Sequence, residues 1–125
     1  MIYLDTHVII WLYAGRGDLI PLKTAQMIES EDLVISPICE LEVQYLFEIG
    51  KIKEEARRIT SDLAVRIGLS VCTLPFENVI SLSLKESWTR DPFDRLITSH
   101  ARLQNAPLLT KDRSIQKHYE KASWE

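Results

Sequence analysis

Short apolar blocks alternate along the whole chain with stretches in which apolar residues recur at helical spacing. Short apolar runs bounded by polar or turn residues are typical of buried strands, whereas apolar residues three or four positions apart are typical of a helix. The runs predict strands at 1–4, 33–35, 69–74 and 107–109, with an edge strand at 122–124. The helical spacing predicts helices at 6–12, 21–30, 37–49, 53–67, 75–84, 92–101 and 114–119.

Strands that alternate with helices predict an α/β fold, in which a mostly parallel sheet of four or five strands is covered by helices on both faces. The chain has 125 residues, the size of one ordinary domain, so we expect a single domain spanning 1–125. Ligands of such sheets bind beyond the carboxyl ends of the strands. Residues that directly follow a predicted strand are therefore the first candidates for a functional site.

The composition is that of a globular chain, with 46% hydrophobic and 26% charged residues. No segment is long and apolar enough to span a bilayer, and Asp5 and His7 interrupt an apolar start that lacks a basic leader. We therefore expect a cytoplasmic protein without a membrane segment. Cys39 and Cys72 have no partner at metal-ligand or redox-motif spacing and are expected to be buried, reduced thiols.

Acidic residues stand at each place where the predicted fold would put a ligand. Asp5 and Asp112 each directly follow a predicted strand. Pro92 suits the first position of a helix, which makes Asp91 the expected N-cap and places Asp94 in the first turn. We expect these side chains to converge on one rim of the sheet.

Converging carboxylates need a cation, because two unit charges about 4 Å apart repel by about 4 kcal/mol at an effective dielectric constant of about 20. All-oxygen ligand sets suit hard cations, so the natural choice is Mg²⁺ or Mn²⁺. Such a site can activate a water and bridge phosphate oxygens, as in metal-dependent nucleases and phosphatases. The formal net charge of −3 does not indicate a nucleic-acid binder, so any such binding must be local or helped by a cation.

A purely structural interpretation of each acid remains open at this point. Asp at an N-cap or in a first turn stabilises a helix whether or not it has another role, which covers Asp5, Asp91 and Asp94. Asp112 suits a turn, and Glu42 suits a solvent-facing helix position. These interpretations leave unexplained why acids follow two separate strands.

Four segments together resemble the PIN-domain proteins, and more narrowly the VapC-type toxins of toxin–antitoxin pairs. They are Leu4-Asp5-Thr6-His7 with Trp11, the Ser36-Pro37 helix that carries Glu42, Asp91-Pro92-Phe93-Asp94-Arg95-Leu96-Ile97, and Leu109-Thr110-Lys111-Asp112. The resemblance covers nearly the whole chain in the right order. It implies a three-layer α/β fold and a magnesium-dependent endoribonuclease, with an antitoxin as protein partner.

By matching motif positions, the resemblance assigns the catalytic and metal-binding places to Asp5, Glu42, Asp94 and Asp112, with Asp91 as an added metal ligand. Thr6, Thr110 and Arg95 are candidates for a supporting role. Arg95 and Lys111, which adjoin site acids, are candidates to contact phosphate. Glu40 has no counterpart in the family and is expected to point elsewhere.

The remaining polar and aromatic residues favour structural roles. We expect the three histidines to be structural or on the surface, and the three tryptophans to lie in the core or an interface, with Trp88 close to the site. Apolar helix faces make a homodimer the expected assembly. Two alternatives to the ribonuclease remain: a catalytically silent PIN-like module that binds RNA or protein, and a metal phosphatase that acts on small molecules.

Overall fold

The computed structural model describes all residues, 1–125, and has five parallel strands in one sheet. The strand order is β3-β2-β1-β4-β5, with strands β1 (Ile2–Leu4), β2 (Leu33–Ile35), β3 (Ser70–Val71), β4 (Leu108–Leu109) and β5 (Ala122–Ser123). The predicted α/β class and parallel sheet are therefore confirmed.

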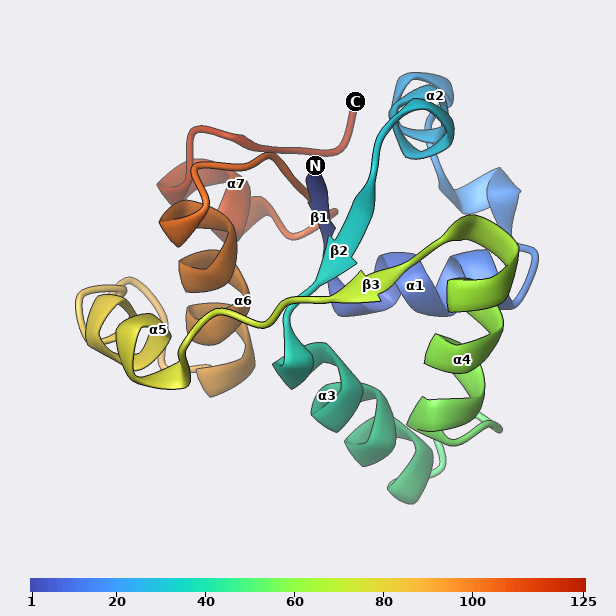
Figure 1. Cartoon of the computed structure of the whole chain (residues 1–125), viewed down its shortest axis with the longest axis horizontal. Coiled ribbons are helices and arrows are strands. Elements are labelled where there is room, and N and C mark those ends of the chain that lie inside the picture. Colours follow the sequence, from blue (N-terminus) through green and yellow to red (C-terminus); the bar gives the residue numbers. More distant parts are fainter.

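Seven α-helices and one 3₁₀ turn connect the strands, as parallel pairing requires. In Figure 1, α5, α6 and α7 lie on one side of the strands, with α1, α3 and α4 on the other. The bounds are α1 Thr6–Tyr13, η1 Gly17–Leu19, α2 Leu22–Ser30, α3 Pro37–Glu48, α4 Ala56–Ile67, α5 Phe76–Ser83, α6 Pro92–Leu103 and α7 Arg113–His118. No helix is both long and apolar enough to cross a membrane.

Strand β1 is the centre of the hydrophobic core. Its three residues, Ile2, Tyr3 and Leu4, are at most 1% exposed because both sheet faces are covered. Complete burial of such a side chain contributes about 1.5–3 kcal/mol, so this strand is fixed firmly beneath the residues that follow it. Cys39 and Cys72 are buried free thiols, as predicted.

Two predicted elements are shorter than expected by three residues or more, and tertiary contacts account for one of them. The helix predicted at 53–67 begins only at Ala56, whose backbone N–H donates to Gln44 Oε1 of α3 at 3.1 Å. This cap comes from another helix, so no local signal marks it. The strand predicted at 69–74 is limited to Ser70–Val71, with one further ladder-like bond from Cys72 N–H to the Ile35 carbonyl.

Candidate active site

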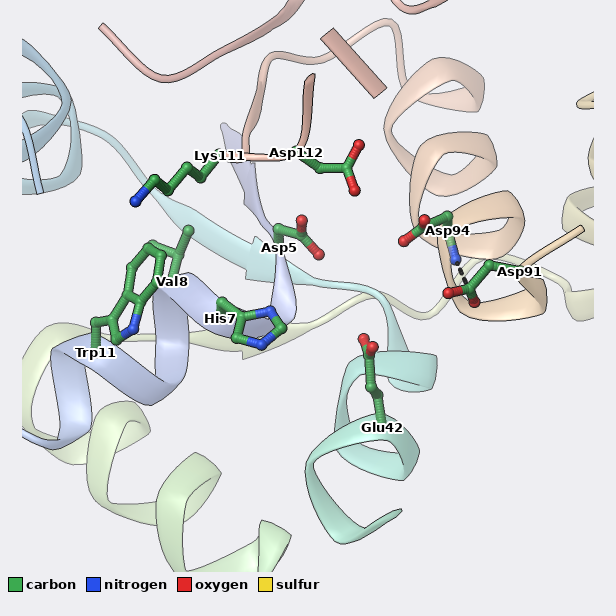
Figure 2. A pocket seen from close by; sticks show the side chains of 9 residues that line it. All are labelled: Asp5, His7, Val8, Trp11, Glu42, Asp91, Asp94, Lys111 and Asp112. Atoms are coloured by element: carbon green, nitrogen blue, oxygen red, sulfur yellow. Dashed lines mark hydrogen bonds between the residues drawn. The ribbon is translucent and has the colours of Figure 1, made fainter. Parts of the chain in front are cut away.

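Five carboxylates line one cavity of about 470 Å³, and they are the five acids that the sequence singled out (Figure 2). Two follow strands, one comes from the middle of α3, and two come from the start of α6. The cavity residues are Asp5, Glu42, Asp91, Asp94 and Asp112, together with His7, Val8, Trp11 and Lys111. In this view Asp5 and Asp112 lie near the centre, Asp91, Asp94 and Glu42 lie to their right, and Trp11 and the Lys111 ammonium lie to their left.

The pairing of β1 with β4 brings Asp5 and Asp112 to the same edge of the sheet. Leu4 lies beside Leu109 in parallel register, and Asp5 N–H donates to the Leu109 carbonyl at 3.0 Å. Residues that follow paired parallel strands emerge at one edge, which places both acids at the cavity.

Asp5 is the most buried acid of the site, at 8% exposure. It is the N-cap of α1 and accepts hydrogen bonds from Thr6 N–H at 2.8 Å and from Thr110 Oγ1 at 2.5 Å. Burial raises the pKa of Asp5, while the bonds from Thr110 and Thr6 act in the opposite direction. The capping interpretation is thus correct for Asp5, but it does not exclude a role in the cavity, which the residue also lines.

Glu42 faces the cavity rather than bulk solvent. The Thr6 hydroxyl donates to Glu42 Oε1 at 2.5 Å, which ties the start of α1 to α3. Burial is the main cause of the raised pKa of Glu42, with the negative charge of Asp5 adding to it. Glu40, two residues earlier, points to α4, where it accepts from Thr60 Oγ1 at 2.8 Å and pairs with Arg57 at 3.1 Å.

Asp91 and Asp94 have different roles at the start of α6, because only the Asp91 side chain caps the helix. Asp91 Oδ1 accepts from the backbone N–H groups of Phe93, at 2.8 Å, and Asp94, at 3.4 Å, which confirms it as the N-cap. The Asp94 carboxylate accepts no hydrogen bond from the protein and has a pKa raised to about 7. Burial is the first cause, followed by the charges of the other four acids.

Asp112 is the N-cap of α7, because one of its carboxylate oxygens, Oδ1, accepts from Ile115 N–H at 2.9 Å. Its own backbone N–H donates to Thr110 Oγ1 at 3.0 Å. The Thr110 side chain therefore contacts both strand-following acids. Thr6 and Thr110 thus each form hydrogen bonds with site acids.

The structure does not bring Arg95 or Trp88 to the cavity. Arg95 donates from Nε to the Thr89 carbonyl at 2.9 Å and from Nη1 to the Ser83 carbonyl at 3.5 Å, which fixes the loop before α6. Trp88 stacks on His118, with ring centroids 4.8 Å apart. Arg95 is on the first turn beside Asp94, but helix geometry points adjacent residues in different directions.

His7 and Trp11 also line the cavity, although no functional role is predicted for either from the sequence. They stand four positions apart on α1, with ring centroids 6.0 Å apart, and Lys111 Nζ lies 5.9 Å from the Trp11 ring centroid. The available signal was their spacing, since i and i+4 share one helix face immediately after Asp5.

The five carboxylates of the cavity offer only oxygen ligands, and such a set fits a hard divalent cation. The unpartnered carboxylate of Asp94, with a pKa that four neighbouring charges raise, marks the place where positive charge is most needed. No three Asp, Glu, His or Cys side chains already converge in ligand geometry.

Comparisons with known proteins agree with this architecture. The PIN domain family model matches residues 2–121. Among solved structures, the chain is similar to VapBC2 from Rickettsia felis, which was solved bound to a DNA fragment from the VapBC2 promoter. The TM-score is 0.69 at 23% identity, and the match covers 100% of this chain and 98% of the other. VapBC-1 from nontypeable Haemophilus influenzae has a TM-score of 0.67 at 25% identity, covering 100% and 97%. None of the curated protein sequences matches the chain. The chain belongs to the PIN domain family, as the resemblance of its sequence motifs predicted.

Proposed function

We propose that this protein is a magnesium-dependent endoribonuclease and the toxin of a toxin–antitoxin pair. The single observation that carries the proposal is the convergence of five carboxylates on one cavity of a PIN domain, one of them without any hydrogen-bond donor. The two solved structures described above are VapBC proteins, which supports the toxin assignment.

The residues that would hold Mg²⁺, or Mn²⁺, are Asp5, Glu42, Asp94 and Asp112, with Asp91 as an additional ligand. The bound cation would supply a Lewis acid that polarises a phosphate oxygen and acidifies a water. Thr110 and Thr6 hold the Asp5 and Glu42 carboxylates in fixed orientations through bonds of 2.5 Å each. The ammonium of Lys111, on the side of the cavity away from Asp91 and Asp94, would attract the RNA backbone.

An antitoxin is the expected protein partner. A basic side chain from such a partner would neutralise the acidic cavity as a cation does, and so would block it. Exposed apolar side chains on α3, at Leu41 and Tyr45, and at its C-cap, Ile49, offer a face for the expected homodimer. We retain the cytoplasm as the expected location.

Two glutamates on α3 provide a matched test of the ribonuclease. Glu42→Gln removes a cavity carboxylate, whereas Glu40→Gln alters an acid that faces α4. With single-stranded RNA and Mg²⁺, we expect Glu42→Gln to lose at least a hundredfold in cleavage rate, and Glu40→Gln to stay within about threefold of the parent. This expectation follows from the loss of one ligand charge from the metal site.

The alternatives give different results in the same assay. RNA binding without product in either metal would indicate the catalytically silent module. Hydrolysis of a generic phosphate monoester with intact RNA would indicate the small-molecule phosphatase. Equal cleavage by the parent and by Glu42→Gln would rule out the proposed site.

A further inference from the structure

A second cavity of about 560 Å³ adjoins the acidic one, and Lys111 lines both. It lies along the carboxyl end of β5 and the start of α7. The residues that characterise it are Lys111, Arg113, Gln116, Ser123 and Trp124, with Glu125 as its one acid. The second cavity therefore carries two basic side chains in a protein whose net charge is negative.

Arg113 is the one arginine of eight whose guanidinium has no partner in the protein. The other seven each pair with a carboxylate or donate to a carbonyl, as Arg16, Arg57, Arg58, Arg66, Arg90, Arg95 and Arg102. Lys111 also has no acidic partner within 4.0 Å, and its ammonium lies over Trp11 instead. Two exposed cations without partners, beside an acidic cavity, can both bind an external anion.

Aromatic rings extend from the acidic cavity into the second one. Trp11 lines the first cavity and Trp124 lines the second, and their ring centroids are 5.5 Å apart. The backbone of Trp124 is fixed because its carbonyl accepts from the buried hydroxyl of Thr24 on α2 at 2.6 Å. The preceding Ser123 carbonyl accepts from Thr110 N–H at 3.0 Å. Trp124 is thus held in a defined place beside the site.

We propose that the second cavity binds the nucleotide next to the scissile phosphate of a single-stranded RNA. Its phosphate contacts Lys111 and Arg113, and its base packs against Trp124. The proposal rests on the ribonuclease function given above. An RNA strand has phosphates on either side of the one in the acidic cavity, and these need cations rather than carboxylates. Cations combined with aromatic rings are the pattern of single-strand binding, in which stacking tolerates any base.

The first test measures RNA affinity in a protein that does not cleave. Full-length Asp94→Asn with Mg²⁺ is titrated into a fluorescently labelled single-stranded RNA, with and without Arg113→Ala. Loss of one phosphate contact should weaken binding about tenfold at low salt and reduce the slope of log K against log salt by about one. The matched control is Arg58→Ala, which changes an exposed arginine on α4 that pairs with Glu54, and it should change the affinity less than twofold.

The second test concerns the ring of Trp124. Trp124→Leu should weaken RNA binding about tenfold, whereas Trp124→Phe should retain most of it, because a phenyl ring still stacks. Thermal melts of both variants establish that the fold is intact, and if the leucine variant does not fold, the phenylalanine variant and Arg113→Ala still decide the matter.

Each outcome separates this proposal from the ribonuclease proposal. RNA affinity and salt slope unchanged by Arg113→Ala would overturn the second-cavity assignment, whatever the cleavage assay shows. If Arg113→Ala leaves RNA binding intact and weakens a complex with the antitoxin instead, the second cavity belongs to the protein partner and the proposal is wrong. If Asp94→Asn and the parent both fail to bind or cleave RNA, the ribonuclease function itself fails.

Discussion

The hydroxyl of Thr110 donates to Asp5 Oδ2 at 2.5 Å, joining residues 105 positions apart at the ends of adjacent strands. The Thr110 hydroxyl oxygen itself accepts from the backbone N–H of Asp112 at 3.0 Å. One fully buried side chain therefore fixes the spacing of two site acids. It also partly offsets the effect of burial on the pKa of Asp5.

Removal of this hydroxyl should destabilise the protein and impair the site together. Thr110→Val keeps the volume but leaves the Asp112 N–H without a partner and the Asp5 carboxylate with the Thr6 N–H as its one remaining donor. We expect the free energy of unfolding to fall by about 1–3 kcal/mol and RNA cleavage to be largely lost. Urea denaturation and the cleavage assay measure the two effects.

Thr110→Ser is the control, because it keeps the hydroxyl and loses only a buried methyl group, which costs about 0.8 kcal/mol. Its cleavage should stay near that of the parent. If valine and serine variants cleave RNA equally well, Thr110 serves the core and not the site.

Local signals explain why most elements could be predicted from the sequence. Asp91 before Pro92, and Ser36 before Pro37, mark the starts of α6 and α3, and the structure shows both side chains as N-caps. Both signals act within one turn of chain. Gly68 likewise ends α4 with φ at +70°, the left-handed conformation that glycine adopts without strain.

Long-range contacts account for what the sequence did not reveal. Arg95 turns to the Thr89 and Ser83 carbonyls because α5 packs beside α6, and this neighbour cannot be read from the motif itself. On α3 the apolar line through Leu41 and Tyr45 is exposed, whereas Cys39 and Val43 are buried. Spacing predicts an apolar face but not which element covers it.

Arg102 should be important for stability outside the site. It donates from Nε to Glu86 Oε1 at 2.6 Å, and Glu86 is only 4% exposed. Arg102→Met would leave that carboxylate buried with only the Trp88 indole N–H as donor. We expect a loss of about 3 kcal/mol in urea denaturation, because an unpaired buried charge costs about 3–5 kcal/mol.

The double variant Glu86→Gln with Arg102→Met removes the charge as well as its partner. It should recover part of the loss seen in Arg102→Met alone. If the double variant is less stable than the parent by the sum of the losses measured for Arg102→Met and Glu86→Gln separately, the two side chains do not interact and the ion pair has no special role.

Asp94→Asn should separate metal binding from helix capping. The change keeps the shape and removes a charge that the other four acids repel. Without metal we expect a melting temperature at least equal to that of the parent, since loss of the charge at the helix start costs at most about 1 kcal/mol. With Mg²⁺ the variant should gain little stability and show no cleavage.

Asp91→Ser is the companion change, because serine caps a helix about as well as aspartate. If Asp91 acts mainly as a cap, this variant keeps both its melting temperature and its activity. Cleavage retained by Asp94→Asn, together with a lowered melting temperature, would instead make Asp94 a structural residue and move the metal site elsewhere.

The pH dependence of stability should reveal the repulsion at Asp94. Its pKa is raised from 3.8 in the unfolded reference to about 7, so between these values the folded protein binds more protons than the unfolded chain. Stability must then fall as pH rises through this range. The raised pKa values of Asp5 and Glu42 add to this fall. Burial lowers the pKa of His100, so the contribution of this residue to stability rises with pH below about pH 6.5, opposite to that of the acids.

The decisive quantity is therefore the difference between the metal-free parent and Asp94→Asn, in which the contribution of His100 cancels. We expect the free energy of unfolding of the variant, relative to that of the parent, to increase from pH 5 to about pH 7 and then to level off. Mg²⁺ should stabilise the parent more strongly at pH 7.5 than at pH 5.5, because the cation binds the ionised carboxylate and displaces its proton. Thermal melts at both pH values, with EDTA and with Mg²⁺, measure these margins. A margin independent of pH, and a Mg²⁺ effect of equal size at both values, would mean that Asp94 is already ionised at pH 5 and that the acids do not form one electrostatically coupled cluster.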